Sequence, residues 1–157
     1  MKQNNIGIRK AKNSDSEEIK KLVFSILREY GLQSDPLKTD SDLDDIEGTY
    51  FEKGGMFYVL EDDAPSIIGT AGLYAVDRST CELRKMYLEK MYRGIGIGKK
   101  LIEVIVIKAK ELGFNVMVLE TASVLKEAVG LYTNYGFKEY QPEHLSNRCD
   151  QAYFIEL

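Results

Sequence analysis

The residues best suited to chemistry lie in a glycine turn. The run Arg93-Gly94-Ile95-Gly96-Ile97-Gly98 precedes a mostly apolar segment, Lys99 to Leu112, that is typical of a helix. Glycines at every second position allow a ligand to approach the backbone closely. Because free N–H groups and the positive end of the helix dipole meet where a helix begins, such a turn attracts anions. The turn predicts an anion-binding site, most simply for phosphate.

Spacing excludes two common nucleotide-binding loops. A P-loop requires Gly-x-x-x-x-Gly-Lys-Ser/Thr, but Arg93 stands five positions before Gly98 and Lys100 stands where the hydroxyl residue belongs. The dinucleotide fingerprint Gly-x-Gly-x-x-Gly fails as well, because Lys99 and Leu101 occupy the two positions where its third glycine would fall. The pattern that remains is Arg-x-x-Gly-x-Gly.

Strand and helix patterns surround the turn in a regular order. Alternating or continuous apolar runs predict strands, with Asp62 to Pro65 joining two of them as a hairpin; the strands are 6–10, 56–61, 67–76, 81–88, 116–120, 137–140 and 152–157. Helical spacing predicts three helices. The first is opened by a capping box of Ser14 and Glu17, and the three end at glycines: 14–30 before Gly31, 99–112 before Gly113 and 123–135 before Gly136.

Length and composition limit the class of protein. The 157 residues suit a single domain, 1–157, and 44% hydrophobic with 29% charged residues is ordinary for a globular protein. A net charge of -4 argues against nucleic-acid and membrane partners. Met1 to Lys10 lacks the apolar core of a signal peptide, and Val104 to Ile107 is too short to span a bilayer, so we expect a cytoplasmic protein. Cys81 and Cys149 are expected to be free thiols, and no spacing predicts a metal site.

Two polar segments are candidates for the walls of a substrate site. Leu32 to Thr49 is acidic and is either a loop or a short helix near Ser41; it forms either a solvated surface or a lid that attracts a cationic amine. Gln141 to Gln151 holds Arg148, Asp150 and the single histidine, His144, which is either a solvated residue or a general base.

A second motif gives these elements a family. Ala128-Val129-Gly130-Leu131-Tyr132-Thr133-Asn134-Tyr135-Gly136-Phe137 is similar to Ala-x-x-Leu-Tyr-x-x-x-Gly-Phe of the GNAT superfamily of N-acetyltransferases, and Arg-x-x-Gly-x-Gly resembles its acetyl-CoA pyrophosphate loop. The chain departs from the motif at Gly130, which is an unusual residue within a helix. A glycine there costs about 1 kcal/mol relative to alanine. The resemblance implies an α/β (α+β) fold: a mixed, mostly antiparallel sheet of six to seven strands with helices on both faces, splayed between strands 82–88 and 116–121.

The resemblance also implies roles for residues. Acetyl-CoA is the implied cosubstrate, with no metal, and its binding residues would be Met86, Tyr87, Leu88, Arg93, Gly94, Ile95, Gly96, Ile97, Gly98, Lys99 and Tyr132. The Leu88 amide would donate to the oxyanion, and Tyr132 would protonate the CoA sulfur unless it is simply a core aromatic.

Strand alternation places Glu82, Arg84, Met86 and Leu88 on one face. If Leu88 lines the acetyl site, Glu82 could act as the base, often through water, or could instead pair with Arg84 or Lys85. Arg84 could hold a carboxylate of the substrate through its planar fork of donors.

The sequence therefore predicts an N-acetyltransferase that moves acetyl from acetyl-CoA to a primary amine of a small metabolite by direct attack in a ternary complex. A non-catalytic acyl-CoA sensor and a protein N-terminal or lysine acetyltransferase remain as alternatives, and the resemblance leaves a homodimer open.

Overall fold

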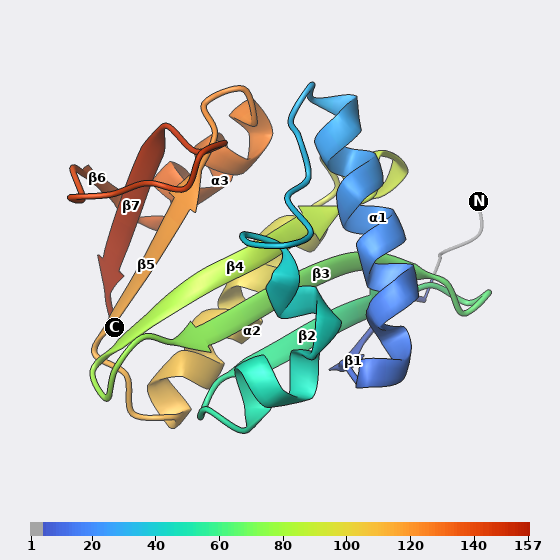
Figure 1. Ribbon diagram of the computed structural model, residues 1–157, viewed down its shortest axis with the longest axis horizontal. Helices are drawn as coiled ribbons and strands as arrows, with labels where there is room; N and C mark the ends of the chain where they lie inside the picture. Colours follow the sequence, from blue (N-terminus) through green and yellow to red (C-terminus); the bar gives the residue numbers. More distant parts are fainter. Residues whose placement is uncertain (1–4) are drawn as a thin grey trace.

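The computed structural model describes residues 5–157 and contains a seven-stranded sheet of order β1-β2-β3-β4-β5-β7-β6 (Figure 1). The strands are β1 (Gly7–Lys10), β2 (Met56–Glu61), β3 (Ile67–Ala75), β4 (Thr80–Leu88), β5 (Val116–Thr121), β6 (Lys138–Tyr140) and β7 (Gln151–Glu156). β4 and β5 pair in parallel, and the other neighbours pair antiparallel. The predicted mixed, mostly antiparallel sheet is confirmed. Residues 1–4 lie outside the described residues. They belong to the predicted domain, 1–157, and to the segment Met1 to Lys10 that is expected to lack a signal peptide.

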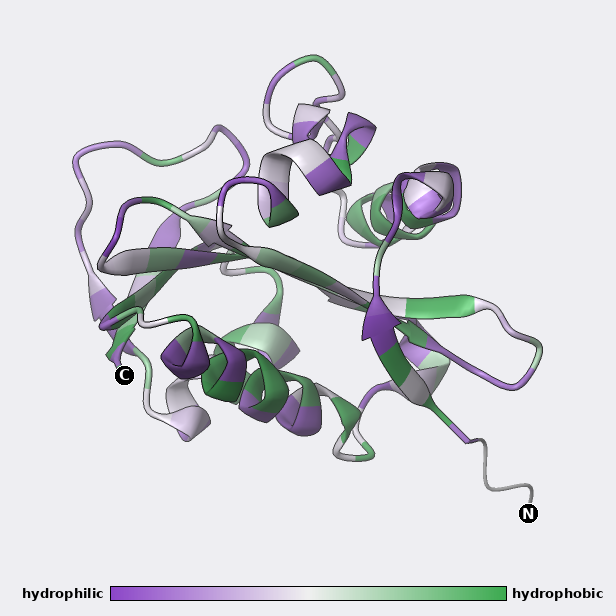
Figure 2. Ribbon diagram, turned by 90° about the horizontal axis from the view of Figure 1, so that it is seen from below, coloured by the Kyte–Doolittle hydropathy of each residue, from purple (hydrophilic) through white to green (hydrophobic). Residues whose placement is uncertain are grey.

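Helices cover both faces of the sheet. α1 (Ser16–Glu29) and the short turns that follow it lie on one face, and α2 (Ile97–Glu111) lies on the other (Figure 2). α3 (Lys126–Tyr135) packs on the α2 side, where Tyr132 joins a buried cluster that includes Leu101 and Ile102. A second cluster, containing Ile19, Val23 and Leu27 of α1, fills the opposite face.

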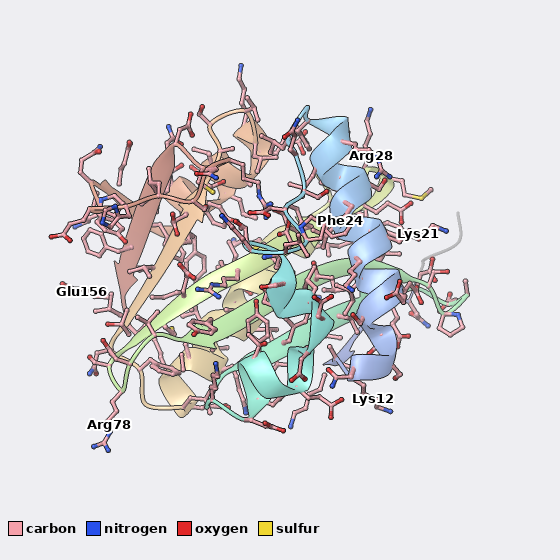
Figure 3. The ribbon with its side chains drawn as sticks, viewed as in Figure 1. Lys12, Lys21, Phe24, Arg28, Arg78 and Glu156 are labelled. Carbon is pink, nitrogen blue, oxygen red and sulfur yellow. The ribbon has the colours of Figure 1, made fainter. Side chains whose placement is uncertain are left out.

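α1 is amphipathic, as its sequence pattern predicts. Ile19 and Val23 are buried, whereas Lys21 and Arg28 project outward (Figure 3). The predicted capping box of Ser14 and Glu17 is wrong. The helix begins at Ser16 after a 3₁₀ turn, Asn13–Asp15, because the Asp15 carboxylate accepts the Lys12 N–H at 2.8 Å.

α3 begins three residues later than predicted. The backbone N–H and hydroxyl of Ser123 donate to the Asp150 carboxylate at 2.7 and 2.5 Å, so Ser123 is held against the β6–β7 loop and does not enter the helix. This contact fastens the loop, residues 141–150, to the end of β5.

The acidic segment after α1 forms a 3₁₀ turn at Ser41–Asp44 and a π-helical turn at Glu47–Phe51. The prediction that this segment forms a solvated acidic surface is wrong for two of its carboxylates. Asp40 and Asp42 are 1% and 8% exposed, because they neutralise buried cations from other parts of the chain. Within residues 5–157, no helix is long and apolar enough to cross a membrane.

Candidate active site

The sheet opens between its two parallel strands. Pairing of β4 with β5 stops at Glu82 and Val118, although β4 continues to Leu88 and β5 to Thr121, and the two strands diverge from there (Figure 1). The predicted splay is therefore confirmed. Backbone groups beyond the last pair are left free of β4–β5 ladder bonds and face whatever enters the gap.

The glycine turn lies beside this opening and begins α2. Gly94 and Gly96 have φ of +77° and +90°, angles that favour glycine over other residues. A Cβ on Gly98 would stand 2.9 Å from Leu131 Cδ2, so this glycine lets α2 and α3 approach closely. The turn, the end of β4 and α3 enclose a cavity of ≈ 440 Å³, here named the glycine-turn groove.

Most residues predicted to bind the cosubstrate line this groove. They are Met86, Tyr87, Leu88, Arg93, Gly94, Gly96, Gly98, Lys99 and Tyr132. Ile95 and Ile97 are not among the lining residues: Ile95 is 68% exposed, and Ile97 packs against the core cluster that contains Leu101. The left-handed glycines and the first turn of α2 fit a pyrophosphate bound by backbone N–H groups.

Arg93 makes its contacts with protein groups. Its Nε donates to the Leu88 carbonyl at 2.7 Å, and its Nη1 donates to Glu29 Oε2 at 2.6 Å and to the Tyr30 hydroxyl at 2.8 Å. Arg93 thereby connects α1 to the end of β4. Its guanidinium fixes the position of Leu88 and does not depend on a phosphate for its partners.

A β-bulge in β4 corrects the predicted alternation. Gly72 pairs with Arg84 and Thr70 pairs with Tyr87, so Ala71 alone stands opposite Lys85 and Met86. Cys81, Leu83, Met86 and Leu88 all contact the core cluster on the α2 side. The prediction that Glu82, Arg84, Met86 and Leu88 share one face is therefore wrong, because the extra residue reverses the alternation beyond Arg84.

The Leu88 amide points into the opening. The next amide, Glu89 N–H, donates to the Ile68 carbonyl on β3 at 2.8 Å. Because successive amides of a strand point in opposite directions, Leu88 N–H points away from β3, toward the gap that β5 leaves. This orientation suits the predicted oxyanion donor.

A second cavity adjoins the first. This cavity of ≈ 340 Å³, here named the charged pocket, is lined by Lys38, Glu82, Arg84, Lys85, Glu120 and Arg148 together with uncharged polar and apolar residues. Met86, Tyr87 and Tyr132 line both cavities, so the two meet at these side chains. A molecule in the groove and a molecule in the pocket would touch there.

Tyr132 is 5% exposed, and its ring packs at 5.8 Å from that of Phe137. Burial raises the pKa of Tyr132, so its hydroxyl keeps its proton at neutral pH. A protonated hydroxyl where the two cavities meet can donate to a departing group.

Glu82 and Arg84 form an ion pair with each other, and the Arg84 guanidinium lies 3.8 Å over the Tyr74 ring. Both residues line the charged pocket. The guanidinium predicted to hold a substrate carboxylate thus already has a carboxylate partner within its own strand.

The structure contains a buried ion network that the sequence did not predict. Lys85 Nζ lies 3.3 Å from Asp40 and 3.1 Å from Asp42, and Arg148 donates to Asp40 at 2.6 and 2.8 Å. Burial raises the pKa of Asp40, but hydrogen bonds from Arg148 and the Asp35 N–H, with the charge of Lys85, outweigh it and leave this pKa below its ordinary value. In the sequence, the one signal of this network is Lys85, because strand alternation places this lysine on the same face as Leu83 and Tyr87.

Of the remaining candidates, His144 and Asp150 lie outside the two cavities, whereas Cys149 lines the charged pocket. His144 is exposed and lines neither cavity, and Asp150 binds Ser123. Cys81 and Cys149 are free thiols. Among residues 5–157, no group of three His, Cys, Asp or Glu side chains could hold a metal ion.

A splayed sheet, a glycine turn at a helix N-terminus and two adjoining cavities define an acyl-CoA-dependent transferase. The acetyltransferase (GNAT) family matches residues 21–137. The chain is 35% identical over 129 residues to the N-acetyltransferase YjgM of Escherichia coli (strain K12), covering 79% of this chain and 77% of the relative. The chain belongs to the GNAT family and is an acetyl-CoA-dependent acyltransferase.

Solved structures agree with this assignment. A GNAT acetyltransferase from Staphylococcus aureus MU50 has a TM-score of 0.90 at 29% identity, with 97% of this chain and 99% of that chain covered. A GNAT acetyltransferase from Elizabethkingia anophelis, solved with acetyl-CoA bound, has the same fold, with a TM-score of 0.67 at 23% identity over 98% of this chain and 99% of that chain.

Proposed function

We propose that this enzyme transfers acetyl from acetyl-CoA to the primary amine of a small metabolite. The observation that carries the proposal is the charged pocket, whose ≈ 340 Å³ suits a small molecule and which meets the glycine-turn groove at Tyr132. Its walls are held together by the Arg148–Asp40 pair, which joins the segment after α1 to the β6–β7 loop. That closure favours a small acceptor over an extended peptide.

Three groups of the chain would act on the reacting atoms. The first turn of α2 would hold the pyrophosphate through backbone N–H groups. The Leu88 N–H would stabilise the oxyanion, an interaction typically worth about 3 kcal/mol in the transition state. The Tyr132 hydroxyl would give its proton to the departing sulfur, and the amine would attack directly, without a covalent enzyme intermediate.

Thermal shift tests the first half of the proposal. Acetyl-CoA at about a hundred times its dissociation constant should stabilise the fold by roughly 2.7 kcal/mol, or on the order of 5 to 10 °C. ATP and NAD serve as controls. An equal shift with ATP would remove the assignment of the groove.

An amine panel tests the second half. We expect CoA thiol release with at least one of the common amino acids, short alkylamines or polyamines, and none with peptides that offer only a free N-terminus or a lysine. Release with the peptides alone would identify a protein acetyltransferase. Acetyl-CoA binding without release on any amine would identify a sensor.

A further inference from the structure

One cation of the charged pocket has no carboxylate partner. The three cations that do have one are Arg84, Lys85 and Arg148. Lys38, the fourth, has no carboxylate oxygen within 4.0 Å of its ammonium among residues 5–157. Both acidic residues of the lining, Glu82 and Glu120, are therefore beyond ion-pair distance of Lys38. Its charge is available to a ligand.

The backbone that carries Lys38 is fixed beside the pocket. The Lys38 N–H donates to the Asp35 carbonyl at 3.3 Å, and the Lys38 carbonyl accepts the Ser41 N–H at 3.1 Å and the Ser41 hydroxyl at 2.6 Å. The buried Lys85 ammonium donates to the next carbonyl along the chain, that of Thr39, at 3.2 Å. The Lys38 side chain itself is exposed. Because its main chain is held and its four-carbon stem is flexible, its ammonium can turn toward a molecule in the pocket.

Lys38 lies on the side of the pocket away from the glycine-turn groove. It lines the charged pocket and not the groove, whereas Tyr132 lines both. An acceptor whose amine reaches the junction at Tyr132 would therefore extend its other end toward Lys38. An ammonium at that end favours an acid group, because a hydrogen bond between two charged groups is stronger than one between neutral groups.

We infer that Lys38 binds a carboxylate of the acceptor, so that the substrates of this enzyme are amines that also carry an acid group. This inference rests on the proposed function and narrows its class of substrate. It also replaces Arg84, which is paired with Glu82 and lies over the Tyr74 ring, as the residue that holds the carboxylate. Lys38 determines specificity through binding and takes no part in bond making or breaking.

The test uses two acceptors that differ in one charge. They are the best amino acid of the panel described above and the same amino acid with its carboxylate capped as an amide, compared at equal concentrations of neutral amine. Wild type should have a KM about tenfold lower for the acid than for the amide. Lys38→Gln should raise the KM for the acid about tenfold and leave kcat unchanged, because the lost contact is the same in the ground state and the transition state. The KM for the amide should not change.

Two further variants and added salt sharpen the test. Lys38→Arg keeps the charge and should keep the preference for the acid, whereas Lys38→Glu should make the amide the better substrate. Lys21→Gln, at an exposed lysine that projects from α1 (Figure 3), is the matched control and should behave as wild type. Because salt screens exposed charges, the preference of wild type for the acid should shrink as salt is added.

The outcomes separate this inference from the proposed function. Equal KM values for acid and amide in wild type, or an equal rise of both in Lys38→Gln, would overturn the role of Lys38 and leave the acetyltransferase intact. The same change in Lys21→Gln would also overturn it, since the effect would then come from net charge. Acetyl-CoA affinity, measured by titration calorimetry, should be the same in all variants. A wild-type chain that acetylates no amine of the panel would remove the proposed function and this inference together.

Discussion

At the scale of single residues, Lys85 is the most constrained side chain of the site. Its φ of +53° is in the left-handed region, which costs about 1 to 2 kcal/mol for a residue other than glycine. Its side chain is 5% exposed between Asp40 and Asp42. The ion pairs therefore stabilise a backbone conformation that the bulge of β4 requires.

Replacing Lys85 tests that compensation. Lys85→Met removes the charge, leaves Asp40 with Arg148 as its cation partner and takes the ion pair away from the buried Asp42, so the free energy of unfolding should fall by about 3 to 5 kcal/mol. Urea unfolding measures this change, and Lys53→Met, at an exposed lysine, is the control. Equal stability of the two variants would mean that the buried pairs contribute nothing.

The role of the Tyr132 hydroxyl can be tested by removing a single oxygen atom. Tyr132→Phe keeps the ring that packs on Phe137 and removes only the hydroxyl. We expect kcat to fall by about 10² to 10⁴ with acetyl-CoA affinity unchanged, because the lost group donates only to the departing sulfur. Tyr135→Phe, on the same helix and outside both cavities, should keep wild-type turnover. Equal turnover of both variants would assign Tyr132 to the core alone.

At the scale of elements, the sequence predicted the order of strands and helices but not the faces of β4. The period-two pattern of β4 is regular over Cys81 to Leu83. No glycine in the sequence marks the bulge at Lys85 and Met86. Two carboxylates more than forty positions away, Asp40 and Asp42, stabilise the bulge. The start of α3 was missed for a similar reason, since its decisive partner, Asp150, is 27 positions from Ser123.

Replacing Gly130 tests whether acetyl-CoA approaches α3 at this position. A Cβ built there meets no atom within 4 Å, and the residue lines the glycine-turn groove. Gly130→Ala should therefore raise the free energy of unfolding by about 1 kcal/mol, the helix-propensity difference. The same methyl group would enter the groove, so we expect weaker acetyl-CoA binding by calorimetry. Gain of stability with unchanged affinity would show that the ligand does not approach this turn of α3.

At the scale of the whole molecule, ion pairs join segments that the sheet itself leaves apart. Arg93 connects α1 to the glycine turn through Glu29, and Asp40 connects the segment after α1 to β4 and to the β6–β7 loop. Arg93 lines the glycine-turn groove, and the cations paired with Asp40, which are Lys85 and Arg148, line the charged pocket. The site therefore depends on pairs that only the folded chain forms.

This dependence predicts the response of the fold to acid. Because the pKa of Asp40 is lower in the folded state than in the unfolded state, the unfolded chain binds the proton more readily as pH falls. The stability that Asp40 contributes is complete above its unfolded pKa, near 4, and is lost as pH falls through its folded pKa. In urea titrations between about pH 6 and about pH 3, Asp40→Asn should be less stable than wild type at the upper end and lose less stability on acidification. Asp63→Asn, at an exposed carboxylate, should follow the wild-type slope. Parallel slopes for wild type and Asp40→Asn would mean that other carboxylates carry the acid sensitivity and that the Arg148–Asp40–Lys85 link does not.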